Sequence, residues 1–172
     1  PYGINAAGYT IHSAIHAARE DVACVLHTHT EAGLAISALK CGLLPINQDA
    51  VRFYKRIGYH DYEGVSLELG ERERLVESLG PHRALILHNH GLLTAGRTIA
   101  EAFALMYHLE KGCVAQLMVN ARSADDPHII MPSPELCEHS ARQAWSINDK
   151  SEDVRWPALV RWMDRESPGF RE

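Results

Sequence analysis

Apolar residues recur at helical spacing in four stretches of the chain. Helices are predicted over 10–19 with Thr10 as N-cap, over 30–42 ending at Gly42, over 70–80 closed by Gly80, and over 99–119. Thr98 and Glu101 form a capping box ahead of the last of these helices. Its buried stripe is predicted to hold Ile99, Phe103, Met106, Cys113 and Leu117.

Short apolar runs with β-branched residues predict the strands. Strands are predicted over 21–29, 43–47 and 50–54, and two more over 82–96, joined by a tight turn at 89–91. Residues 56–64 are rich in turn formers and carry no predicted element. Several links are too short for parallel crossovers. We therefore expect an α/β fold with a mixed, largely antiparallel sheet and helices on both faces.

The chain divides near residue 122. Its 172 residues suit one domain, which we assign to residues 1–122. Residues 123–172 read as a proline-containing polar linker followed by a C-terminal helical tail, with helix expected over 135–147. The tail carries Trp156 and Trp162, so we expect it to dock on its own core or on a neighbouring subunit.

Composition narrows the class of protein. The formal net charge of -5 argues against unaided binding to nucleic acid or to an anionic membrane. No apolar run approaches the roughly 20 residues that span a bilayer. The 4 cysteines show no CxxC spacing, so a reduced, cytoplasmic setting is expected. The 11 histidines are an unusual number, and histidine is the commonest metal ligand.

Two pairs of histidines share the pattern H-x-H at the end of an apolar run. His27 and His29 project to the same side of a strand, about 7 Å apart by the strand rise. His88 and His90 repeat the spacing. One such pair is common by chance and also fits a solvated strand face. If the two strands are neighbours, three or four imidazole nitrogens converge on one ion at roughly 2.0–2.1 Å, as zinc requires.

The other histidines carry weaker signals. His12 and His16 lie one helical turn apart, but Ser13 stands where an HExxH motif has its glutamate. A packing role, or orientation of a metal ligand through a ring N–H, is the favoured interpretation. The remaining histidines have no partner by spacing and are interpreted as surface or structural residues: His60, His82, His108, His128 and His139.

With these motifs in place, the chain resembles the class II aldolase/adducin family, and its bacterial adducin-like branch in particular. The resemblance runs from Pro1 to about residue 120 and is most specific in "HSAIHAAREDVACVLHTHTEAGLAISALKCGLLP" and "LILHNHGLLTAG". It implies a three-layer α/β/α sandwich, assembled as a homotetramer or other homo-oligomer. It also implies zinc, or another divalent metal ion, held by His27, His29 and His90, with His88 as a possible additional ligand.

The same resemblance implies a lyase, in which the metal polarises the carbonyl of a small hydroxylated or sugar-phosphate-like substrate while a C–C bond breaks. Three departures bear on this expectation. Gly8 stands where the aldolases carry an acid/base glutamate, and Gln48 lies near the position of a tyrosine offered by a neighbouring subunit. The phosphate-binding loops of the aldolases precede Pro1, so we expect the chain to be a fragment or a processed form.

Other residues are candidates for the missing acid/base. The candidate catalytic residues are Glu31, Asp49 and Tyr59, and Tyr54 and Asp61 are further candidates. Such a group must come within hydrogen-bond reach of the substrate. The alternative hypothesis is a non-catalytic, adducin-like assembly or binding domain, which the absent catalytic groups favour and the intact histidines oppose.

Overall fold

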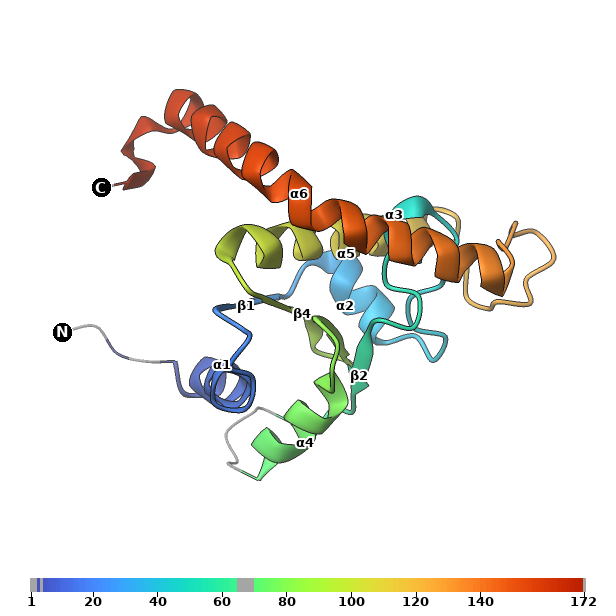
Figure 1. Cartoon of the computed structure of the whole chain (residues 1–172). Helices are drawn as coiled ribbons and strands as arrows, with labels where there is room; N and C mark the ends of the chain where they lie inside the picture. Colours follow the sequence, from blue (N-terminus) through green and yellow to red (C-terminus); the bar gives the residue numbers. More distant parts are fainter. Residues whose placement is uncertain (1–2, 4, 65–69, 172) are drawn as a thin grey trace.

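The central layer is a four-stranded mixed sheet (Figure 1). The computed structural model describes residues 3, 5–64 and 70–171. The strands are β1 (Cys24–Thr28), β2 (Gly58–His60), β3 (Ala84–Leu87) and β4 (Gly91–Gly96), in the order β1-β4-β3-β2. β4 is antiparallel to both of its neighbours, whereas β2 pairs with β3 in parallel. The expected mixed, largely antiparallel sheet is confirmed.

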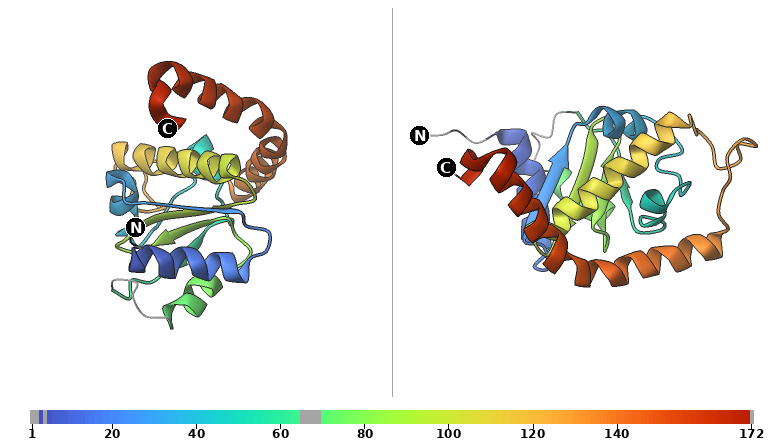
Figure 2. Two further views of the ribbon diagram at one scale, coloured as in Figure 1. Left: turned by 90° about the vertical axis from the view of Figure 1, so that its left-hand side faces the viewer. Right: turned by 90° about the horizontal axis from the view of Figure 1, so that it is seen from above.

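Helices cover both faces of this sheet, which gives the expected three-layer α/β/α arrangement (Figure 2). They are α1 (Ala6–Ala18), α2 (Glu31–Ser37), α3 (Gln48–Val51), α4 (Glu71–Leu79), α5 (Ile99–Met118) and α6 (Pro134–Glu166), followed by a 3-10 turn, η1 (Pro168–Arg171). α1 and α4 cover one face, and α2 and α5 cover the other. None of the helices in the described part is long and apolar enough to cross a membrane.

The period of the strands divides the core into two halves. Leu85 and Leu87 of β3 pack with α1 and α4, whereas Ile86 between them packs with α2 and α5. All four residues of β3 and all six of β4 are buried. Because successive side chains of a strand point to opposite faces, one short apolar strand contributes to both cores. This burial fixes the register on which the histidines depend.

The predicted helices exist, but two of their ends differ from expectation. α1 begins four residues earlier than predicted, because the Asn5 side chain accepts a hydrogen bond of 3.0 Å from the Gly8 N–H. Thr10 is therefore not the N-cap. α2 ends at Ser37, and Gly42 lies beyond it in a turn with φ of 59°. The capping pair Thr98 and Glu101, and the closure of α4 by Gly80, are confirmed.

The segment before β2 was predicted wrongly. Residues 43–47 form no strand, and residues 48–51 form α3 because Asn47 caps its first turn through a 2.9 Å hydrogen bond from the Ala50 N–H. Residues 58–60 form β2, which was not predicted. The stripe assigned to α5 was also partly wrong: Ile99 is 64% exposed, while Leu105 and Leu109 are fully buried. α6 extends the expected tail helix to 33 residues.

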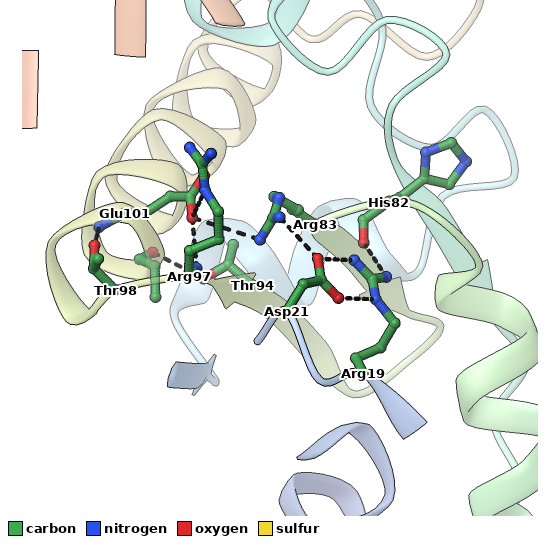
Figure 3. A network of polar contacts seen from close by, with 9 residues as sticks. Arg19, Asp21, His82, Arg83, Thr94, Arg97, Thr98 and Glu101 are labelled. Atoms are coloured by element: carbon green, nitrogen blue, oxygen red, sulfur yellow. Dashed lines mark hydrogen bonds and ion pairs between the residues drawn. The ribbon is translucent and has the colours of Figure 1, made fainter. Parts of the chain in front are cut away.

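A polar network closes the end of the sheet where β1 and β3 begin (Figure 3). Arg83 lies between two carboxylates, with nitrogens 2.8 Å from Asp21 and 3.5 Å from Glu101. Arg19 pairs with Asp21 at 2.7 Å. Glu101 is only 1% exposed, and its backbone N–H donates to the Thr98 hydroxyl. The network ties the connections before β1 and β3 to the first turn of α5, at the end of the sheet opposite to the histidines.

Candidate metal centre

Three histidines meet at the other end of the sheet. His27 is on β1, His29 follows its last residue, and His90 lies in the turn between β3 and β4. Pairing of β1 with β4 brings that turn beside the end of β1. One ring nitrogen of each histidine lies within 4.8 Å of those of the other two. The ring centroids are 4.6 to 4.9 Å apart and the rings meet edge to face.

A backbone hydrogen bond orients His27. Its Nδ1 lies 2.8 Å from the carbonyl oxygen of Leu92 on β4. Since a carbonyl can only accept, Nδ1 carries the proton and Nε2 keeps its lone pair. Nε2 lies 2.8 Å from Nε2 of His29. Two nitrogens bound to one tetrahedral zinc lie roughly 3.3 Å apart, so a small outward rotation of the rings accommodates an ion.

The electrostatics favour the neutral imidazoles of His27 and His90. Burial, together with the neighbouring His90 and His29, lowers the pKa of His27 to about 4 against the opposing effect of the Leu92 carbonyl. Burial, followed by His29, also lowers the pKa of His90. Neutral imidazole is the form that binds metal. The donor set therefore fits a cation that accepts nitrogen ligands, such as zinc.

The turn that carries His90 needs residues with unusual backbone freedom. Asn89 has φ of 55°. Gly91 has φ of 143°, which lies in a region of the backbone map that disfavours any residue with a Cβ. A Cβ on Gly91 would also collide with the carbonyl oxygen of Thr28 and lie 3.2 Å from the His29 ring. Glycine at this position thus lets the turn approach β1 closely enough for His90 to join the other two histidines.

His88 does not join this group. Its ring stacks on Tyr59 with centroids 5.7 Å apart, and its Nδ1 lies 3.0 Å from Asp61 Oδ1. Its backbone N–H donates to the carbonyl of His60 at 2.8 Å. That His88 is an additional metal ligand remains a prediction. The geometry instead favours His88 as a polar residue next to the three histidines, in contact with Tyr59 and Asp61.

The candidate acid/base residues are dispersed. Glu31 is exposed in the first turn of α2. Asp49 lies 2.6 Å from Nδ1 of His108 on α5. The Tyr59 hydroxyl accepts the Leu43 N–H at 3.1 Å, and burial raises the pKa of its phenol. Of the three, Tyr59 contacts the turn that carries His90, because its ring stacks on His88.

Gly8 lies in the first turn of α1, where the three heavy atoms nearest to a Cβ would all belong to Asn5, at 3.7 Å or more. Space for a larger residue is therefore present. His12, one turn later, is partly buried and lowers the pKa of His27, which places it near the group. His16 Nδ1 lies 3.3 Å from the Val22 carbonyl oxygen, a structural contact.

Sequence reasoning missed one buried polar pair beside the site. His60 and Glu71 are 5% and 6% exposed, and His60 Nε2 lies 3.6 Å from a Glu71 oxygen. His60 Nδ1 lies 3.0 Å from the Ser78 hydroxyl oxygen. Their charges act on the pKa of His90 in opposite directions. Glu71 begins a charged helix that reads as solvated, so no sequence signal pointed to its burial.

Comparison with known proteins places this geometry in a family. Residues 2–117 match the sequence profile of the Class II Aldolase and Adducin N-terminal domain. The chain belongs to this family. Alpha-adducin of Rattus norvegicus is 41% identical over 176 residues, a match that covers 94% of this chain and 23% of alpha-adducin.

Solved structures of the family support the fold. An aldolase II superfamily protein from Pseudomonas syringae is 45% identical, with a TM-score of 0.89 over 99% of this chain and 67% of that one. L-fuculose 1-phosphate aldolase from Glaciozyma antarctica PI12 is 34% identical, with a TM-score of 0.69 over 81% of this chain and 51% of that one. This chain thus spans only part of the length of the relatives it matches.

Proposed function

We propose that His27, His29 and His90 bind one divalent cation, zinc foremost, as the metal centre of a lyase acting on a small hydroxylated carbonyl or sugar-phosphate-like compound. The observation that carries the proposal is the convergence of three ring nitrogens within 4.8 Å. The aldolase relatives support it. When bound, such an ion supplies Lewis acidity that polarises a substrate carbonyl.

The residues of this chain contribute orientation and protonation state. The Leu92 carbonyl holds His27 with Nε2 directed at the site. Burial keeps His27 and His90 neutral at physiological pH. Tyr59 is the proposed proton donor, because its ring contacts His88 beside the turn that carries His90. Gly8, lacking a side chain, cannot take this role.

A second candidate function is that of an adducin-like assembly or binding domain. The 41% identity to alpha-adducin over almost the whole chain favours it. In both cases we propose a homo-oligomer, with a tetramer as the family resemblance implies. A reduced cytoplasmic setting is also proposed, supported by cysteines that are all free. The three converging histidines favour the metal-dependent function.

Metal analysis of the purified protein tests the proposal. About one zinc or other divalent ion per chain is expected in the wild type, and none in a His27→Ala/His29→Ala double variant. His16→Ala serves as the matched control, because the ring of that histidine lies against the Val22 carbonyl and the variant should leave the metal content unchanged. Equal, substoichiometric metal in all three proteins would refute the metal centre.

Activity then separates the two functions. The metal-loaded protein, together with any flanking sequence native to it, is offered a panel of sugar phosphates and hydroxy acids, and carbonyl products are measured. Turnover that the double variant lacks supports the lyase. Stoichiometric metal with no turnover on the whole panel would favour the assembly function.

A further inference from the structure

An apolar cavity of about 690 Å³ lies between α5 and the second half of α6, away from the histidine group. Figure 2 shows this half of α6 passing along the outer side of α5. The walls are largely aromatic: Phe103 and Tyr107 come from α5, and Trp156 and Trp162 come from α6. Phe103 and Trp156 meet edge to face at 5.6 Å and join the two walls.

The cavity has the size and lining of a small-molecule site. Ligand pockets typically measure roughly 300–1,000 Å³ and combine apolar walls with a few polar groups. Here Tyr107 and Trp162 are each 52% exposed and Phe103 is 41% exposed. Large aromatic side chains so exposed, on two facing helices, form an accessible apolar surface.

One end of the cavity is cationic. His108 and Arg155 line it, and Arg155 is exposed on α6. The carboxylate of Asp49 lies 2.6 Å from Nδ1 of His108. Nε2 of His108 is the ring nitrogen that does not take part in this contact. Burial, then Arg52 and, less strongly, Arg155, lower the pKa of His108 against the effect of Asp49. Among the residues whose side chains the structure describes, two guanidinium groups thus act on His108 against one carboxylate.

We propose that this cavity binds an amphipathic monoanion, an alkyl or aryl carboxylate. Its apolar body lies between the aromatic walls, and its carboxylate pairs with Arg155 near His108. The planar guanidinium of arginine matches a carboxylate in two parallel hydrogen bonds. The guanidinium of Arg155 in an otherwise largely apolar lining selects an anion over a neutral or cationic molecule of equal length. This site is independent of the metal centre.

Dodecanoate, below its micelle concentration, is the probe. Trp156 and Trp162 line the cavity, so binding changes the intrinsic tryptophan fluorescence. Dodecanoate should bind at least tenfold more tightly than dodecan-1-ol or dodecyltrimethylammonium. Arg155→Gln should abolish most of that preference and leave the affinity for dodecan-1-ol unchanged. Arg161→Gln, a change on the same helix outside the lining, is the matched control.

A second variant tests the location. Ala104 lines the cavity on α5, so Ala104→Trp should fill it and remove dodecanoate binding. Circular dichroism verifies that the variant folds. Equal affinity for the three probes, or dodecanoate binding that Arg155→Gln leaves intact, would overturn the proposal. Absence of dodecanoate binding, with a lower mass for Ala104→Trp in light scattering, would instead assign the cavity to contacts between copies of the chain.

Discussion

The Nδ1 atom of His27 and the carbonyl oxygen of Leu92 lie 2.8 Å apart across the pair of strands β1 and β4. This contact does two things at once. It satisfies a polar atom of a partly buried ring, and it assigns the proton to the nitrogen that faces away from the other histidines. His29 is exposed, and its ring nitrogen Nε2 lies 2.8 Å from Nε2 of His27. Two candidate ligands of one ion are therefore held in different ways.

Alanine at position 27 and alanine at position 29 should have different effects. Both variants lose metal affinity. His27→Ala should also reduce the free energy of unfolding of the metal-free protein by about 1–3 kcal/mol, because it removes buried ring contacts and leaves the Leu92 carbonyl without this donor. His29→Ala should change it by less than about 0.5 kcal/mol. Urea unfolding in a chelator, with zinc titrations alongside, measures both quantities. Equal losses of stability would show that the hydrogen bond does not matter.

Gly91→Ala should destabilise the site turn. A Cβ would require a strained backbone at φ of 143° and would collide with the Thr28 carbonyl. Each strained residue costs roughly 1–3 kcal/mol, and the collision adds to that loss. Gly64→Ala is the control, because Gly64 also has a positive φ of 103°, and no atom of the described residues lies within 4 Å of a Cβ built there. The difference in Tm between the variants isolates the effect of the collision. A smaller loss for Gly91→Ala than for Gly64→Ala would contradict the close approach.

Removal of the Glu101 carboxylate should destabilise the fold strongly. Glu101 is 1% exposed and accepts from the Arg97 N–H at 2.5 Å, while Arg83 lies 3.5 Å away. Loss of one partner from a buried network typically costs about 3–5 kcal/mol. Glu101→Ala should approach that loss in chemical denaturation. Arg142→Ala, which removes a surface pair with Glu138, should cost no more than about 0.5 kcal/mol.

Cys113 should be the least reactive thiol. It is fully buried in α5, and burial raises the pKa of its thiol to about 12. At pH 8 about one molecule in 10,000 carries the thiolate, the reactive form. Iodoacetamide followed by peptide mass spectrometry should therefore modify the partly exposed Cys41 well before Cys113. Early modification of Cys113 in the folded protein would show that α5 opens locally.

The raised pKa of Cys113 also makes the stability of the protein depend on pH. The unfolded thiol loses its proton near pH 9.0, whereas the buried thiol keeps it to about 12. The unfolded state therefore binds fewer protons in this range, and the free energy of unfolding falls as the pH rises from 9 to 12. Cys113→Ala should show a shallower fall than the wild type in urea titrations over that range.

The pattern of apolar residues predicted the main elements because their burial is periodic. β3 is apolar throughout and β4 is apolar except for Thr94, and the capping pair that begins α5 can be recognised in the sequence. β2 could not be predicted in the same way. It has three residues and depends on parallel pairing with β3, a partner 27 residues away in the register from Gly58 to Leu85. α3 depends on the single capping side chain of Asn47, which outweighed the apolar residues around it.

For the candidate site, spacing alone placed His88 and His90 on one side of a strand. In the structure both lie in a turn, where the left-handed backbone of Asn89 breaks the alternation of side chains. His90 turns towards His27, and His88 turns towards Tyr59. Period-two reasoning therefore could not choose between them. The choice came from the family resemblance, in which the histidine before a glycine is the ligand.

The pairing of β1 with β4 has a consequence for how the chain acquires its site. The hairpin of β3 and β4 joins neighbours in sequence, but His27 reaches His90 only when a loop of some sixty residues has closed. Long loops close late because their entropy must be offset by contacts that form elsewhere. The three nitrogens therefore come together only when the sheet is nearly complete. In a refolding experiment, the appearance of tight zinc binding would time the arrival of β1, and the ion would act as a reporter of the last strand to join.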